Sequence, residues 1–249
     1  MDDLTWLGFT WDEAPVYQSE RTALYQAALE ELTAGGHVYP CFCTRAQLMS
    51  LAAPNLGDTQ VVYQRTCASL SPEEIAQRRK TRAPAMRLRV PEEEIAFTDR
   101  LFGPFSEHLA RDCGDFILQR SDGLFGYQLA VVVDDGLQGV TEIVRGRDIL
   151  SATPRQLYLQ RLLGYPQPEY VHIPLLTDAQ GRRLAKRDKD LDLSALAQRF
   201  TPEELLGFLA CSAGILPEPR PMTLEQLIPL FDWARVTRED WRLPEGIMA

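Results

Sequence analysis

The stretch FGYQLAVVVDDGLQGVTEIVRGRDIL, residues 125–150, carries the main indication of how this chain folds. Its long apolar run has the composition of a buried strand. Polar side chains flank that run, with Tyr127 near its start and Arg145, Arg147 and Asp148 beyond its end. Such groups are costly to bury unless they are hydrogen-bonded or face a site. Two interpretations follow: a ligand site, or a buried strand with a salt-bridged exit loop.

The residues after this stretch predict a βαβ unit. The sequence TPRQ, residues 153–156, has the pattern of a capping box, and the apolar flank of the helix that it starts ends at Gly164. Residues 170–176 have the composition of a second buried strand. This order predicts a doubly wound α/β sheet, in which ligands bind at the carboxyl ends of the strands. Arg145 lies at such an end.

Composition limits the class of protein. The chain has 249 residues, 45% of them hydrophobic, and this predicts one large or two smaller globular domains. A net charge of -9 disfavours general coating of nucleic acid but permits a local basic patch. The acidic N-terminus and the lack of a long apolar run predict a cytoplasmic protein with no membrane segment. Five cysteines without an export signal favour thiols or metal ligands over disulfides, with Cys113 and Cys211 as small core residues.

The flanking segments read as packing elements. Residues 20–34 predict an amphipathic helix after a surface-like loop, and no strand precedes that helix. Its expected apolar stripe is Leu24, Ala27, Ala28 and Leu32. Residues 97–116 are irregular enough to predict a connector. From Leu191 onward the pattern is helical, with capping boxes that begin at Thr201 and Thr223.

Two basic segments are candidate phosphate contacts. The first contains the basic end of a helix that is predicted to begin with a capping box at Ser71. It also contains the polar face of a predicted edge strand, residues 86–90, and these two features explain its charge as well as a nucleic-acid face would. The second, RRLAKR at 182–187, follows a strand and could stabilise charge on a transferring phosphate, or form a solvated hairpin. The first segment's cations are Arg79, Lys80, Arg82, Arg87 and Arg89.

Three cysteines are close enough in sequence to share a metal. Cys41, Cys43 and Cys67 could supply three thiolates to a tetrahedral zinc, which takes four ligands. The candidates for the fourth ligand are Tyr63, His37 and water. Three unrelated buried thiols are the alternative.

Together these motifs resemble the catalytic domain of class I glutamyl-tRNA synthetases. The resemblance rests on YQLAVVVDD at 127–135, VRGRD at 144–148 and TPRQ at 153–156. It extends through WLGFTWDEAPVYQSER at 6–21, the cysteine cluster and YVHIPLL at 170–176. It is strongest toward the short paralogues of that family that modify tRNA(Asp). The implied fold is a Rossmann-like class I catalytic domain with a zinc-bearing insertion and a C-terminal helical part.

The resemblance also implies a domain organisation. Residues 1–36 correspond to a remnant of the catalytic domain, 37–115 to the zinc-bearing, acceptor-like insertion, 116–190 to the second catalytic half, and 191–249 to a helical subdomain. The family's His-Ile-Gly-His and Arg-Ile-Glu-Asp segments are not in this sequence, so the domain is expected to be N-terminally incomplete. Three hypotheses follow: such a paralogue with a truncated or mis-assigned start, a fragment of a glutamyl-tRNA synthetase, or a non-catalytic binding module.

The resemblance implies roles for single residues. Tyr127 and Arg145 match the glutamate-binding tyrosine and arginine, and the arginine would offer a bidentate fork to the carboxylate. Lys186 matches the second lysine of the signature loop, which makes it the expected catalytic contact to the ATP phosphates. Arg183 and Ala185 depart from that signature, which has a lysine and a serine there.

The same resemblance implies the metal and the reaction. Cys41, Cys43, Tyr63 and Cys67 match a zinc site in which the tyrosine is the fourth ligand. The complete enzyme would activate glutamate with ATP and magnesium, and then transfer it to the queuosine of tRNA(Asp). A monomer is expected.

Overall fold

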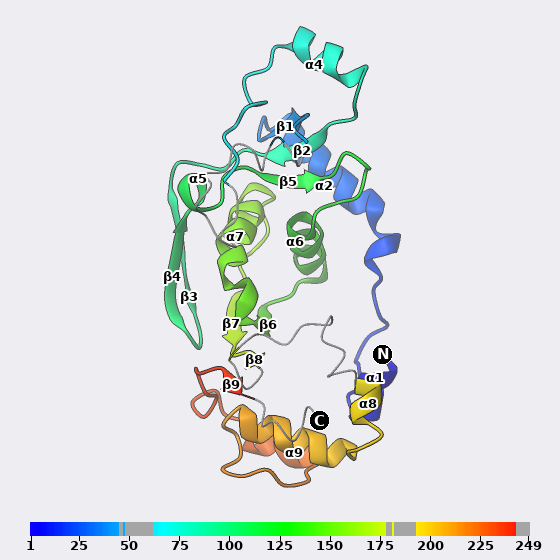
Figure 1. Cartoon of the computed structure of the whole chain (residues 1–249), viewed down its shortest axis with the longest axis vertical. Coiled ribbons are helices and arrows are strands. Elements are labelled where there is room, and N and C mark those ends of the chain that lie inside the picture. The colour runs from blue at the N-terminus through cyan, green and yellow to red at the C-terminus, as the bar shows by residue number, and fades with distance from the viewer. Residues whose placement is uncertain (45–46, 48–61, 178–180, 182–192, 243–249) are drawn as a thin grey trace.

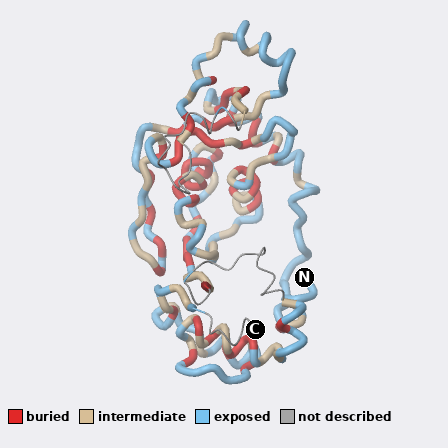
Figure 2. The backbone as a smooth tube through the Cα atoms, viewed as in Figure 1, coloured by how far each residue is buried: buried red, intermediate tan, exposed pale blue. Residues whose placement is uncertain are grey.

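A computed structural model describes residues 1–44, 47, 62–177, 181 and 193–242 (Figure 1). The molecule is elongated in this view, with the cysteine-bearing segment at one end and the C-terminal helices at the other. Buried residues gather around α6, α7 and the three-stranded sheet, and again in the C-terminal helices (Figure 2). No helix in the described part of the chain is long and apolar enough to cross a membrane.

The predicted βαβ unit is confirmed. Strands β6 (Glu142–Gly146) and β7 (Glu169–Ile173) pair in parallel. A 3-10 turn, η2 (Arg147–Ala152), and helix α7 (Thr153–Leu162) connect them. The register places Arg145 opposite His172, near the carboxyl ends of both strands.

The apolar run before β6 is a helix, and the strand predicted there is wrong. Helix α6 (Tyr127–Gln138) begins after Gly126 and ends at Gly139, whose φ of 68° is the left-handed conformation that favours glycine. A short apolar run fits a buried helix as well as a strand, so the glycines at its two ends were the features that indicated a helix. Its buried apolar residues follow helical spacing: Leu129, Ala130, Val132 and Val133.

The first long helix is confirmed, but its buried stripe differs from the predicted one. Helix α2 (Thr22–Ala34) ends just before Gly36, which has a φ of 75°. Leu24, expected in the stripe, is exposed. The helix packs on α6, so the stripe is set by that neighbour. Its buried members are Tyr25, Ala28, Leu29 and Leu32.

A buried carboxylate ties this region to α6. Asp134 accepts hydrogen bonds from Gln18 Nε2 at 2.9 Å, Arg21 Nε at 2.6 Å and Tyr25 Oη at 2.8 Å. Gln18 lies in the short 3-10 helix η1 (Gln18–Glu20). Buried charge is costly unless it is paired, so the three donors fix this N-terminal segment against the core.

A three-stranded antiparallel sheet has the order β1-β2-β5. Its strands are β1 (Val38–Cys41), β2 (Ala85–Leu88) and β5 (Phe116–Gln119). Strand β2 is central, so the predicted edge strand is wrong, and Arg87 on it is buried. The preceding helix α4 (Pro72–Arg79) has the predicted capping box at Ser71.

The predicted connector at 97–116 is also wrong. Strands β3 (Glu94–Asp99) and β4 (Gly103–His108) form an antiparallel hairpin, followed by helix α5 (Leu109–Asp112). Every second residue of β3 is buried, and this alternation is typical of a half-buried strand. The last of these buried residues, Asp99, reaches the functional region.

The C-terminal helices form a second apolar cluster. It contains α8 (Leu193–Leu196), α9 (Pro202–Ser212), α10 (Leu224–Leu227) and η4 (Ile228–Leu230), with both predicted capping boxes present. The chain opens with helix α1 (Asp2–Trp6) in place of the expected loop, and Leu7 packs into this cluster. Strand β8 (Leu176–Thr177) pairs in parallel with β9 (Trp241–Arg242), beside the end of β7.

Candidate functional site

Arg145 is fixed near the carboxyl end of β6. Its Nε donates to His172 Nε2 at 3.0 Å, and its Nη2 donates to Thr153 Oγ1 at 2.7 Å. The guanidinium also lies over the ring of Tyr170, 5.1 Å from the centroid. Among the described residues, no hydrogen bond of Arg145 uses Nη1. One edge of the guanidinium is therefore held while donors remain for a ligand carboxylate.

Thr153 serves this arginine and does not cap α7. The predicted capping box is wrong, because η2 runs directly into α7 and no side chain caps the helix there. Thr153 is fully buried, and its hydroxyl accepts from Arg145. Gln156, the other half of the expected box, donates to Gln128 Oε1 at 2.8 Å and so links α7 to α6.

His172 connects Arg145 to a buried carboxylate. Its Nδ1 lies 2.7 Å from Asp99 Oδ2, and that oxygen also accepts from the His172 backbone N–H at 2.9 Å. Because Arg145 Nε can only donate, His172 Nε2 must accept, which puts the ring proton on Nδ1. Burial lowers the pKa of His172, and the hydrogen bond with Asp99 opposes that shift.

Asp99 itself is satisfied on both oxygens. Its Oδ1 accepts from the backbone N–H groups of Leu101 at 3.0 Å and Phe102 at 2.9 Å, in the turn after β3. Asp99 is almost fully buried, so these donors are its substitute for water. The result is a chain of contacts from the β3–β4 turn through His172 to Arg145.

Asp135 on α6 lies near the guanidinium of Arg145, and Tyr127 begins the same helix. Tyr127, the first residue of α6, is exposed. Burial raises the pKa of Asp135, and Arg145 opposes that shift, so the carboxyl lies within the field of the guanidinium. Tyr127 and Arg145, the two sequence-predicted residues, thus come from α6 and β6, which follow each other in the chain.

The neighbouring charged groups separate the two sequence-based interpretations. Arg147 pairs with Asp240 through Nε at 2.9 Å and through a second, Nη2 contact. Arg147 is a salt-bridged residue at the exit of β6, whereas Arg145 pairs with no carboxylate among the described residues and bonds to His172 and Thr153. Lys186, Arg183 and Ala185 lie outside the described residues, so the predicted phosphate loop stays a prediction.

The three predicted cysteines and the tyrosine come together in a separate cluster with residues of β1. The thiol sulfurs of Cys41, Cys43 and Cys67 all lie within 4.8 Å of one another. Tyr63 Oη lies 3.4 Å from Cys41 Sγ and 3.7 Å from Cys43 Sγ, and the Cys43 and Cys67 sulfurs are 3.6 Å apart. His37, the alternative fourth ligand, is not in this group of described residues.

These distances fit a tetrahedral metal. Zinc–sulfur bonds of about 2.3 Å and zinc–oxygen bonds of about 2.0 Å make tetrahedral edges of roughly 3.8 Å between sulfurs and roughly 3.5 Å between sulfur and oxygen. The observed separations are close to both values. The residues present can therefore hold a zinc ion with little movement.

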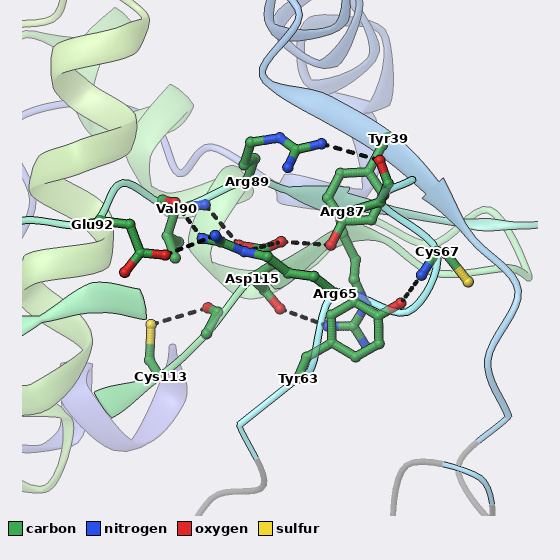
Figure 3. A network of polar contacts seen from close by, with 12 residues as sticks. Tyr39, Tyr63, Arg65, Cys67, Arg87, Arg89, Val90, Glu92, Cys113 and Asp115 are labelled. Carbon is green, nitrogen blue, oxygen red and sulfur yellow. Dashed lines mark hydrogen bonds and ion pairs between the residues drawn. The ribbon is translucent and has the colours of Figure 1, made fainter. Parts of the chain in front are cut away.

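Cysteine sulfur is a common zinc ligand, and the surroundings shift the pKa values of these donors in different directions. Burial acts to raise the pKa of Cys41, but its interactions with Tyr63 and Arg87 outweigh burial and lower that pKa. Burial raises the pKa of Cys43 to about 11 and raises that of Tyr63 further. Tyr63 Oη accepts from the Cys67 backbone N–H at 2.9 Å, which fixes the phenol toward the thiols (Figure 3).

Several functional residues were not found from the sequence. Asp99, His172 and Thr153 hold Arg145, and Arg87 lies beside the cysteines. A signal was present for His172, a histidine in the middle of the apolar segment YVHIPLL. Its partner Asp99 is 73 residues away, so only the fold shows what the histidine does.

Comparison with known proteins identifies the family. The family "tRNA synthetases class I (E and Q), catalytic domain" matches residues 1–233. Glutamyl-Q tRNA(Asp) synthetases of Symbiobacterium thermophilum and Nitratidesulfovibrio vulgaris are each 46% identical to this chain. Those matches cover 99% and 100% of this chain and 80% of each relative.

Solved structures agree on the fold. A glutamate-tRNA synthetase of Elizabethkingia anophelis superposes with a TM-score of 0.82 at 23% identity, over 100% of this chain and 58% of that one. A glutamate tRNA ligase of Elizabethkingia meningosepticum gives a TM-score of 0.81 at 22% identity, over 57% of its length. The chain therefore belongs to the class I (E and Q) tRNA synthetases, in the branch of the glutamyl-Q tRNA(Asp) synthetases.

Proposed function

We propose that this protein acts in the ATP-dependent activation of glutamate and its transfer to the queuosine of tRNA(Asp). The names of its relatives support the substrate and acceptor, and the held guanidinium of Arg145 is the observation that supports glutamate binding. Glutamate, ATP with magnesium, and tRNA(Asp) carrying queuosine are the corresponding partners.

Arg145 and Tyr127 are the proposed glutamate contacts. The Nη1 donors of Arg145 and its remaining Nη2 donor would bind a substrate carboxylate, while His172 and Thr153 keep the guanidinium in place. Tyr127, which is exposed on the first turn of α6, would donate a hydrogen bond from its hydroxyl to the same ligand. Such contacts position the substrate for attack, the main contribution to this class of transfer.

The reaction requires a carboxylate of glutamate to attack the α-phosphorus of ATP. A carbon–oxygen–phosphorus linkage forms, the bond to the bridging oxygen breaks, and pyrophosphate leaves with the electron pair. Lys186 is the proposed contact to the phosphates, on its match to the family's signature loop. A hydroxyl of queuosine then displaces AMP from the glutamyl-adenylate.

We assign the cysteine cluster to a structural zinc held by Cys41, Cys43, Tyr63 and Cys67. Bound zinc would supply cross-linking between β1 and the segment that follows residue 62, with no part in the transfer itself. The proposed organisation is a catalytic remnant at 1–36, an insertion at 37–115, a second catalytic half at 116–190, and a helical subdomain at 191–249.

Glutamate binding and charging test this proposal. Isothermal titration of the chain with L-glutamate should detect binding, which Arg145→Ala abolishes and Arg161→Ala, at an exposed ion pair on α7, preserves. Equal binding by wild type and Arg145→Ala would remove Arg145 from the site.

The acceptor is tested separately. Radiolabelled glutamate should transfer to tRNA(Asp) that contains queuosine and not to the same tRNA lacking that base. Transfer to tRNA(Glu) would indicate a glutamyl-tRNA synthetase, and binding of glutamate without any ATP-dependent transfer would indicate a binding module.

A further inference from the structure

Arg87 is a buried cation without a carboxylate partner among the described residues. Only 6% of it is exposed, and its Nη1 donates to the neutral backbone carbonyl of Asp115 at 2.7 Å. Its Nε is buried and makes no hydrogen bond in the described part of the chain. An unpaired buried charge is among the costliest features of a folded protein, so this arginine needs an explanation.

The nearest buried carboxylate is already engaged. The side chain of Asp115 accepts from Tyr39 Oη at 2.6 Å, from Arg65 Nε at 3.2 Å and from the Val90 backbone N–H at 2.9 Å (Figure 3). Arg65 therefore takes the charge of Asp115, with exposed Glu92 as its second anion. The charge of Arg87 is left to another group.

The cysteine centre is that neighbour. Arg87 lies over the ring of Tyr63, 4.0 Å from its centroid, on the side chain that reaches Cys41 and Cys43. On the sheet, Arg87 pairs with Tyr39, and Cys41 lies two residues farther on the same face of β1. Diagonal neighbours at this spacing are within reach of a long side chain.

The charge of a filled centre complements this cation. Three thiolates around one divalent zinc leave a net negative charge, and a phenolate ligand would add to it. The same centre with three protonated thiols and no metal is neutral, and it gives Arg87 no counter-ion.

We propose that Arg87 is the positioning and charge-compensating residue of the zinc centre, held by the Asp115 carbonyl and stacked on the ligand Tyr63. This inference rests on the proposed zinc site and extends it beyond the four ligands. The guanidinium of Arg87 is a planar cation, so it can both stack on the phenol of Tyr63 and neutralise the metal–thiolate cluster. It makes the sheet around β2 part of the metal site.

Zinc affinity tests the assignment. The reduced full-length chain is loaded with one equivalent of zinc and titrated with a chromophoric chelator. Arg87→Met, of similar length but neutral, should weaken zinc binding by about 10- to 100-fold, the usual range for residues that support metal ligands. Arg87→Lys keeps the charge and should lose less affinity than Arg87→Met. Arg79→Met removes a cation from the exposed end of α4 and should change nothing.

The outcomes separate the proposal from the zinc site itself. Wild type that binds no zinc, or Cys67→Ser that binds it as tightly as wild type, overturns the metal site and this inference together. Wild-type affinity in both Arg87→Met and Arg87→Gln overturns the role of Arg87 alone. Equal weakening by Arg87→Lys and Arg87→Met shows that packing, and not charge, is what Arg87 supplies. Circular dichroism of each metal-free variant identifies one that fails to fold, and Arg87→Gln then replaces Arg87→Met.

Discussion

Replacing Asp99 by asparagine should change the proton position on His172 and release Arg145. The carboxylate accepts two backbone N–H groups on Oδ1, and one backbone N–H and the imidazole on Oδ2. An asparagine has one carbonyl oxygen, so its NH₂ must face one of these pairs of donors. Turning the NH₂ group toward His172 costs less free energy, because the imidazole can move its proton to Nε2 and accept a hydrogen bond on Nδ1. The protonated Nε2 would then face the Nε–H of Arg145. Both groups are donors, so their hydrogen bond would be lost.

The expected magnitude follows from the bonds that are lost. The His172 backbone N–H is left without an acceptor, at about 1–3 kcal/mol, and the contact between Arg145 and His172 is lost, at about 1.5–3 kcal/mol for a bond to a charged group. Asp99→Asn should therefore lower the free energy of unfolding by roughly 2.5–6 kcal/mol, a fall in Tm on the order of 10 °C. The loosened guanidinium should weaken glutamate binding by about 10- to 100-fold.

Nitrogen-15 NMR of the imidazoles is the decisive assay. The chain has only three histidines, so the spectrum of His172 can be assigned by substitution. Wild type should show a neutral ring protonated on Nδ1, and Asp99→Asn a ring protonated on Nε2. Asp112→Asn is the matched control, because Asp112 accepts from the backbone of another histidine, His108, at a partly exposed position. An unchanged His172 proton in Asp99→Asn, or glutamate affinity equal to wild type, would refute the argument.

Three further predictions concern other parts of the chain. Tyr127→Phe should leave the free energy of unfolding within about 0.5 kcal/mol of wild type but weaken glutamate binding by about 10-fold, measured by calorimetry, with Tyr17→Phe at another exposed position as the unaffected control. Because burial lowers the pKa of His172, the unfolded chain takes up the proton first as the pH falls through about 6.5. The unfolding free energy of wild type should therefore fall toward that of His172→Gln on acidification, and parallel pH curves would contradict this. Gly207→Ala places a Cβ 1.7 Å from the Arg220 carbonyl oxygen and should destabilise by about 1–3 kcal/mol in thermal unfolding, and a wild-type Tm would show that this close packing does not exist in solution.

The sequence by itself determined the features that depend on nearby residues. Capping boxes at Ser71, Thr201 and Thr223 formed as predicted, because a cap and its partner are three residues apart. The order of strand, helix and strand around α7 likewise followed from local apolar patterns. The short spacing of Cys41 and Cys43 identified the candidate metal ligands before any contact was known.

Other features were decided only by tertiary structure, because their partners are remote. The pattern TPRQ signals a cap, yet Thr153 bonds to Arg145 instead, since η2 continues directly into α7. Residues 127–138 are apolar enough for a strand or a helix, and the packing of α2 and α7 against them selects the helix.

The same reason explains the charges that were misassigned. Arg87 looked like one of several solvated cations until the sheet order made β2 central and buried it beside Tyr63. Asp99 lies in the segment that was predicted to be a connector. Its role depends on a hydrogen bond with His172 of β7, which is 73 residues away in the sequence. Local patterns indicate caps and several of the elements, because the residues involved are close in sequence. The role of a buried charge depends on a partner that is remote in sequence, so only the fold shows it.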